Sequence, residues 1–152
     1  MTIVEIILGS LFVFGCIMKA GDIPGGSTLL SFSSLLLAMI YFFFSYFIFN
    51  KKRLRHIFRN STYTNTNVFK ILTSVFTGWA LSPFIIGVHF IILHWPEGRI
   101  NLIIGSIWIA IIIVILICGR ARHKEFVMSS IKHVLIIIAI GCFAMLLHQF
   151  GY

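Results

Sequence analysis

Five long runs of apolar residues, separated by short polar segments, make up most of the sequence. We expect these runs to form helices at about residues 3–20, 27–49, 69–93, 100–118 and 131–150. A helix needs about 20 apolar residues to cross the hydrocarbon core of a bilayer, and the runs are close to or above that length. The pattern predicts an all-α, polytopic membrane helix bundle, with residues 1–152 forming a single membrane domain.

The composition favours lipid rather than water as the main solvent. Of the 152 residues, 59% are hydrophobic and 11% are charged, and the mean hydropathy is +1.04. Ordinary soluble domains contain roughly 25% charged residues. A small soluble fold has much surface for its volume, and too few polar residues are present here to cover it. We therefore expect membrane lipid to surround most of the chain.

The basic residues are concentrated in two of the four polar segments, and this bias predicts the topology. The cluster that we expect to set it comprises Lys51, Lys52, Arg53, Arg55, Arg59, Arg120, Arg122 and Lys124. The other two segments hold only Lys19 and Arg99. Because short loops rich in Lys and Arg stay in the cytoplasm, we expect a cytoplasmic N-terminus and an external C-terminus. Basic residues placed between apolar runs do not indicate a nucleic-acid partner.

An internal repeat relates the first pair of runs to the second. A shift of 72 positions gives nine identities without a gap, at Ser10/Ser82, Phe12/Phe84, Gly15/Gly87, Pro24/Pro96, Gly26/Gly98, Leu30/Leu102, Ser34/Ser106, Ala38/Ala110 and Ile40/Ile112. The sequence thus predicts two hairpins in the same orientation, at about residues 3–49 and 71–118, followed by a fifth helix. Parallel repeats of this kind occur in membrane proteins.

Small residues occupy three of four positions spaced by four at the start of the second helix of each predicted hairpin, with Leu30 or Leu102 at the remaining position. The small residues are Gly26, Ser34 and Ala38 in the first copy, and Gly98, Ser106 and Ala110 in the second. Residues four apart share one helix face, and small residues on such a face let membrane helices approach closely. The two faces either pack against each other within the chain or contact another subunit.

The segment GVHFIILHWPEG, residues 87–98, resembles the transmembrane hairpin of the gliding-motility and type 9 secretion subunit GldL, and related small Bacteroidota proteins. GCIMKAGDIPGG, residues 15–26, is similar to a second copy. The resemblance implies a hairpin topology and the cytoplasmic (inner) membrane of a bacterium. That motor family relies on a carboxylate inside the membrane, whereas residues 27–49 and 100–118 contain no Asp or Glu. The resemblance therefore does not extend to motor activity.

A few ionisable residues are candidates for a binding site. His89 lies inside the third run near Pro83, which should kink that helix, and His89 and His94 form a candidate path for an ion or ligand. His94 and His148 could hold a metal or haem if the third and fifth helices are neighbours. Glu5 is expected near the interface, where a charged group can reach water at small cost.

No motif of a known enzyme class is present, so we expect no catalytic residue, no metal site and no cofactor. The patterns favour a non-enzymatic subunit that packs with other membrane subunits or with copies of itself. A small channel or transporter is the alternative, because of the parallel repeat, Pro83 and His89. A haem or quinone redox protein has weaker support, from the histidines alone.

Overall fold

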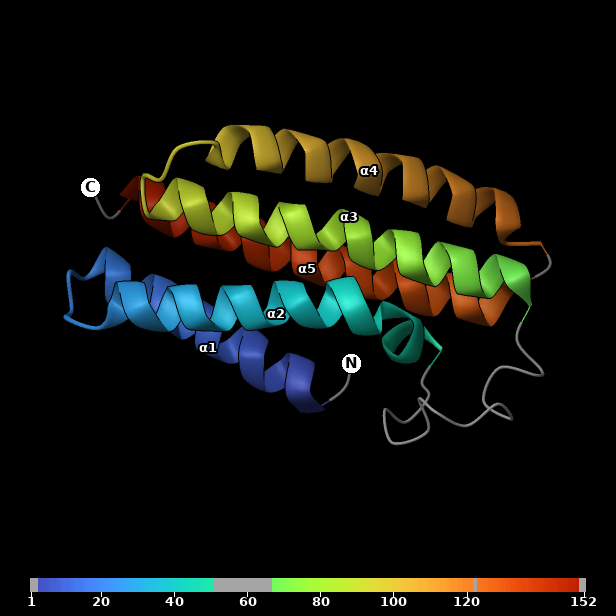
Figure 1. Ribbon diagram of the computed structural model, residues 1–152, viewed down its shortest axis with the longest axis horizontal. Coiled ribbons are helices and arrows are strands. Elements are labelled where there is room, and N and C mark those ends of the chain that lie inside the picture. Colours follow the sequence, from blue (N-terminus) through green and yellow to red (C-terminus); the bar gives the residue numbers. More distant parts are fainter. Residues whose placement is uncertain (1–2, 51–66, 122, 151–152) are drawn as a thin grey trace.

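The computed structural model describes residues 3–50, 67–121 and 123–150, and their regular structure is helical throughout. The helices are α1 (Ile3–Ala20), α2 (Gly26–Phe49), α3 (Val68–Ile92), α4 (Gly98–Gly119) and α5 (Lys124–Phe150), as Figure 1 shows. All five are long and apolar enough to cross a membrane. The chain is therefore a multi-pass membrane protein of the predicted all-α bundle class.

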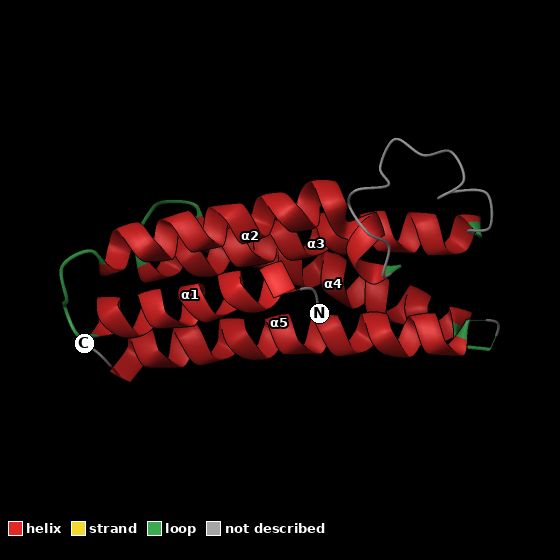
Figure 2. Ribbon diagram, turned by 90° about the horizontal axis from the view of Figure 1, so that it is seen from below, coloured by secondary structure: helices red, strands yellow, loops and turns green. Residues whose placement is uncertain are grey.

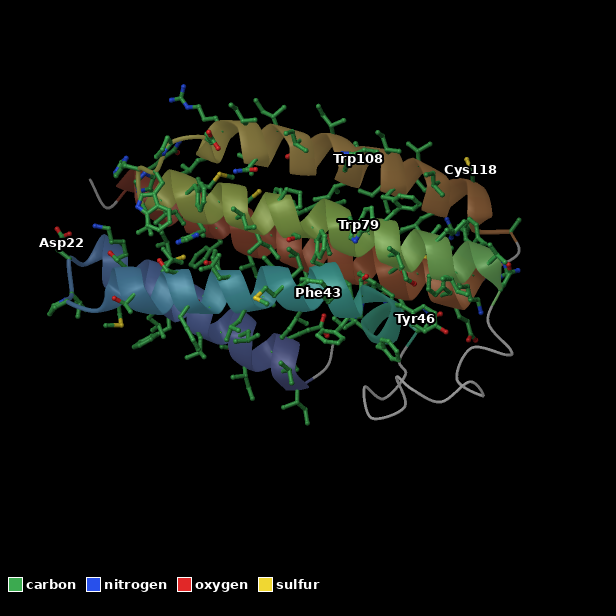
Figure 3. The ribbon with its side chains drawn as sticks, viewed as in Figure 1. Asp22, Phe43, Tyr46, Trp79, Trp108 and Cys118 are labelled. Carbon is green, nitrogen blue, oxygen red and sulfur yellow. The ribbon has the colours of Figure 1, made fainter. Side chains whose placement is uncertain are left out.

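The helices form a bundle of two layers. The helix α3 lies between α2 and α4 in one layer (Figure 1), and α1 and α5 lie together on the other side (Figure 2). The two tight turns, residues 21–25 and 93–97, lie at the same end, which we call the turn end. The opposite end, where α2 ends and α3 begins, is the linker end. Asp22 marks the turn end in Figure 3, and Tyr46 and Cys118 lie toward the linker end.

The helix α5 differs most from its predicted bounds, because it begins at Lys124 rather than at position 131. Its first turns are amphipathic: Phe126 and Val127 are buried, while Lys124 and Glu125 are exposed. The Lys70 ammonium also lies 5.9 Å from the centre of the Phe126 ring, within the range of a cation–π contact. Hydropathy alone misses these turns because charged residues interrupt the apolar run.

The two tight turns have the same backbone conformation at corresponding positions. Asp22 and His94 have φ angles of 50° and 54°, and Gly25 and Glu97 have φ angles of 91° and 67°. Positive φ is unusual for residues other than glycine, so its occurrence at Asp22 and His94 marks a specific turn geometry. Common ancestry of the two hairpins stays a prediction, but their turns are built alike.

Glycines bring the two helices of each hairpin into backbone contact. A Cβ atom on Gly15 would lie 2.9 Å from the amide nitrogen of Leu30. At the corresponding place in the second hairpin, a Cβ atom on Gly87 would collide with the backbone of Leu102. Both positions therefore need glycine, which explains one of the nine identities under the shift, Gly15/Gly87.

The helix α3 continues through Pro83. Beside this residue, the helices α2, α3 and α4 border an apolar groove of about 460 Å³, whose walls include Trp79 and Trp108. Figure 3 shows the two tryptophans on neighbouring helices. Both tryptophans are exposed, so this groove opens at the surface of the bundle.

The residues expected to set the topology are only partly described. Arg120 and Lys124 are exposed at the linker end, as a basic cluster in water requires. The remaining members, Lys51, Lys52, Arg53, Arg55, Arg59 and Arg122, lie outside the described residues.

Candidate functional site

The small-residue face of α2 is buried between two neighbouring helices. Gly26 lies against α1, where its Cβ atom would be 2.7 Å from the amide nitrogen of Lys19. The side chains of Ser34 and Ala38 are buried as well. Further along α2, Tyr41 and Ser45 lie so close to Gly78 of α3 that a side chain at Gly78 would collide with them. The expectation of close helix packing therefore describes α2 well.

The corresponding face of α4 is mostly uncovered. Gly98 is buried in the tight turn, where its Cβ atom would be 2.9 Å from the amide nitrogen of Ile91, but Ser106 and Ala110 are exposed. The two small-residue faces do not pack against each other, because α3 lies between α2 and α4 (Figure 1). The alternative of packing within the chain is thus wrong for Ser106 and Ala110. The alternative of another subunit stays a prediction.

The side chain of His89 lies in the core rather than on a surface. It is 0% exposed, and its Nε2 atom lies 3.0 Å from the hydroxyl oxygen of Ser31 on α2. The centre of its ring is 5.2 Å from that of Trp95, which follows α3 in the tight turn. Among the described residues, Nδ1 has no hydrogen-bond partner. An unpaired buried nitrogen is costly, so this position is not explained by packing alone.

A cavity of about 480 Å³ opens beside this histidine at the turn end. Its polar wall is formed by both hairpins and comprises Lys19, Ser27, Thr28, Ser31, His94 and Trp95. The Ser31 hydroxyl thus joins the cavity to buried His89. His94 borders this cavity, whereas His89 lies in the core behind Ser31 and does not border it. A path through the membrane from there stays a prediction.

His94 also contacts α5. The hypothesis of a metal or haem held by His94 and His148 required this proximity. The centres of the His94 and His148 rings are 4.9 Å apart. Within the described ranges, however, no group of three or more His, Cys, Asp or Glu side chains could hold a metal ion. Two imidazoles fall short of the four ligands of a structural zinc site. The metal and haem hypotheses for this pair stay predictions.

Glu5 lies inside the bundle, contrary to the prediction that it reaches water at an interface. It is 0% exposed, and the Tyr41 hydroxyl donates a hydrogen bond of 2.7 Å to its Oε1 atom. The helix α2 continues from Tyr41 to Phe49, roughly 12 Å beyond this level at 1.5 Å per residue. The sequence prediction was wrong because α1 is shorter than α2 and begins level with the interior of the bundle.

The Glu5 side chain also borders a cavity. This second cavity, of about 470 Å³, lies between α1 and α5 and includes Gly9, Ser10, Ile136 and Ile140 in its walls. A carboxyl group beside apolar walls is unfavourable without hydrogen bonds, and Tyr41 supplies one. Ionisable groups inside membrane helices are functional candidates for this reason.

Three polar residues that take part in these sites were not proposed as site residues from the sequence. A comparison of the two repeat copies could have identified them. They are Lys19, Ser31 and Tyr41, which the shift of 72 positions aligns with Ile91, Ile103 and Ile113. A polar residue in one copy that is isoleucine in the other is not required by the shared hairpin fold. A search for such differences would have identified all three residues.

Comparisons of the chain with protein-family models, with curated proteins and with solved structures found no match. The functional argument therefore rests on the packing, burial and charges of the described residues.

Proposed function

We propose that this protein is a non-enzymatic subunit of a membrane assembly, and that a helix of a neighbouring subunit packs on α4. The observation that carries the proposal is a difference between corresponding surfaces. The buried face of α2, which contacts α3 at Tyr41 and Ser45, has a largely exposed counterpart on α4. We call this counterpart the α4 docking face.

The docking face is defined by the shift of 72 positions. Ser34, Ala38, Tyr41 and Ser45 are all buried on α2. Their counterparts on α4 are Ser106, Ala110, Ile113 and Ile117, of which Ser106, Ala110 and Ile117 are exposed and Ile113 is half-buried. In the first hairpin the next helix along the chain, α3, contacts this face at Tyr41 and Ser45 through Gly78. In the second hairpin α5 does not, because it packs behind α3 (Figure 2).

Packing in lipid explains why small residues matter on such a face. Lipid chains are as apolar as leucine, so membrane helices associate through close packing and hydrogen bonds rather than through the hydrophobic effect. Ser106 and Ala110 allow a neighbouring backbone to approach, as Ser34 and Ala38 do on α2. A helix that met only lipid would gain nothing from small residues at this spacing.

Site-specific photocrosslinking in native membranes tests the docking face. A photoreactive residue at position 106 should give one defined adduct, whereas the same residue at Ile104, on the other side of α4, should give lipid adducts. The mass of the adduct separates a different subunit from a second copy of this chain. Lipid adducts alone from position 106 would contradict the proposal.

A pair of substitutions tests the same face independently. Ala110→Leu should reduce co-purification of the partner in mild detergent, because the larger side chain separates the helices. Ala139→Leu adds the same bulk at an exposed position of α5 and should leave co-purification unchanged. Equal loss in both variants would indicate a general effect of bulk rather than a specific interface.

We also propose that the linker end is cytoplasmic and the turn end external, in the cytoplasmic membrane of a bacterium. The bias of Lys and Arg toward the linker end supports this orientation. A reporter fused after Arg59 should be cytoplasmic, and a reporter fused after Tyr152 should be external. The opposite result at both sites would invert the orientation, and the same side for both would contradict five spans.

A small channel or transporter is a second candidate function. Two buried ionisable side chains favour it, Glu5 with its hydrogen bond from Tyr41 and His89 beside Ser31. Ion or proton flux into liposomes should then decrease in Glu5→Gln and in His89→Ala. Flux equal to that of empty liposomes for the wild-type protein would remove this candidate.

A further inference from the structure

The cavity at the turn end has a polar wall that the hairpin fold does not require. The first hairpin contributes Lys19, Ser27, Thr28 and Ser31 to it. The shift of 72 positions aligns these residues with Ile91, Arg99, Ile100 and Ile103. The second hairpin thus forms the same turn, with the same positive φ angles, while three of the four positions carry isoleucine. Turn formation does not account for the polar residues of the cavity.

These polar residues are rich in hydrogen-bond donors and carry a positive charge. The Lys19 side chain is 24% exposed, and its ammonium nitrogen lies 3.9 Å from a carboxylate oxygen of Asp22, which is 83% exposed. Lys19 belongs to the cavity wall, whereas Asp22 does not. The hydroxyls of Ser27 and Thr28 can donate as well.

The start of α2 adds to this charge distribution. The helix begins at Gly26, beside Ser27 and Thr28, and runs for 24 residues. The N-terminus of a long helix carries a partial positive charge and favours anions. His94, which also borders the cavity, lies beside His148. No Asp or Glu is among the described residues of the cavity wall.

From this arrangement we infer that the turn-end cavity binds a phosphate group. An ammonium group and hydroxyl donors suit the oxygens of a tetrahedral anion, and about 480 Å³ falls within the size range of small-molecule sites. The group belongs either to a water-soluble phosphate compound or to the headgroup of an anionic phospholipid. Both present the same chemistry to the cavity.

The buried histidine positions one of the hydroxyls. Ser31 borders the cavity, and His89 Nε2 lies 3.0 Å from its hydroxyl oxygen. The His89–Ser31 pair therefore fixes the position of the Ser31 hydroxyl in the cavity wall. This inference concerns a different surface from the α4 docking face and does not depend on the proposed assembly.

The experiment uses the full chain in phosphatidylcholine nanodiscs, with inorganic phosphate as the probe in calorimetric titrations. A second arm adds phosphatidylglycerol and measures the phospholipid retained on the protein by native mass spectrometry. Lys19→Met removes the cavity charge. Arg99→Met is the matched control, because it removes a charge at the same end from a residue outside the cavity wall. Thr28→Val removes one hydroxyl without changing the charge or the shape.

Binding of phosphate that weakens about tenfold in Lys19→Met and less than about twofold in Arg99→Met supports the inference with a soluble ligand. Phosphatidylglycerol retained by the wild-type protein and by Arg99→Met, but lost from Lys19→Met, supports it with a lipid headgroup. If Lys19→Met does not fold, Thr28→Val replaces it in the comparison: weaker binding by Thr28→Val than by the wild-type protein supports the inference, and equal binding overturns it. Equal losses in Lys19→Met and Arg99→Met, or no binding in either arm, would overturn it.

Discussion

The two hairpins share their turns and their helix spacing but differ in how far their second helices are enclosed. Within the membrane-length segment of each helix, 56% of the residues of α2 are buried, against 22% of those of α4. The helix α2 lies between α1 and α3, whereas α4 lies at the edge of the layer (Figure 1). A similar sequence pattern therefore gives a core helix in one copy and a peripheral helix in the other.

Polar side chains follow this difference in enclosure. The first hairpin contains Glu5 and Tyr41, which form a hydrogen bond in the core. The corresponding residues of the second hairpin are Thr77 and Ile113. Polar groups in lipid are costly unless protein partners satisfy them. The enclosed hairpin can thus hold polar residues that would be unfavourable on α4.

The largest effect is expected where α2 and α3 touch through glycine. Gly78→Val would drive α2 and α3 apart, because even a Cβ atom at this position collides with Tyr41 and Ser45. We expect a loss of about 3 kcal/mol in unfolding free energy, measured by denaturation in bicelles. Gly9→Ala is the control, since the nearest atom to its Cβ would be Ile140 Cδ1 at 3.9 Å. Similar losses in the two variants would contradict the close approach at Gly78.

A matched pair of serines tests the difference between the hairpins directly. Ser34→Leu should lower the unfolding free energy by about 1–3 kcal/mol, because the side chain of Ser34 is fully buried on α2. Ser106→Leu should change the stability of the isolated chain by less than about 0.5 kcal/mol, because Ser106 is exposed on α4. Thermal denaturation of both purified variants provides the measurement. A comparable loss in Ser106→Leu would mean that the α4 face is covered within the chain.

The buried carboxyl group allows a double-mutant cycle. Tyr41→Phe removes the hydroxyl that donates to Glu5 and should lower the unfolding free energy by about 1 kcal/mol, typical of strong hydrogen bonds between membrane helices. In the double variant Tyr41→Phe/Glu5→Leu, the loss of unfolding free energy should be smaller than the sum of the two single losses, since both substitutions break the same hydrogen bond. Additive losses in denaturation experiments would show that the two side chains are not coupled.

The smallest effect is expected at the His89–Ser31 pair. Ser31→Ala removes a single hydrogen bond and should lower the unfolding free energy by about 0.6 kcal/mol. The same substitution should shift the ¹⁵N resonances of the His89 ring, because Nε2 loses its neighbour at 3.0 Å. Ser27→Ala is the control, as Ser27 borders the same cavity and is exposed. Unchanged His89 resonances in Ser31→Ala would rule out the hydrogen bond.

The sequence predicted the helices well where hydropathy alone decides, and less well where charged residues join a helix. The helix α2 begins at Gly26, against a predicted start at position 27, because a turn with Pro24 and Gly25 fixes its first residue. The helix α5 begins at Lys124 because its polar turns are stabilised by packing against α3. That contact joins residues far apart in the chain, so a local pattern cannot reveal it.

The candidate site was predictable only in part. His89 and His94 were identified from their residue types, and of the two only His94 borders the turn-end cavity, while His89 contacts Ser31 of its wall. The depth of Glu5 could not be predicted, because it depends on how α1 is aligned along α2. Lys19 and Ser31 could have been found by comparing the two copies, since isoleucine replaces both in the second hairpin.

The sequence by itself determined that the chain crosses the membrane, where its helices lie and where the chain turns back. These properties follow from apolar length, from Gly and Pro in the turns, and from local backbone geometry, which all act between near neighbours. Only the tertiary structure decided that Ser34 is buried and Ser106 exposed, and that Glu5 meets Tyr41 inside the bundle. Burial depends on which helices become neighbours in space, and two similar helix faces acquire different neighbours when one helix packs against two others, as α2 does against α1 and α3, and the other helix packs mainly against one, as α4 does against α3.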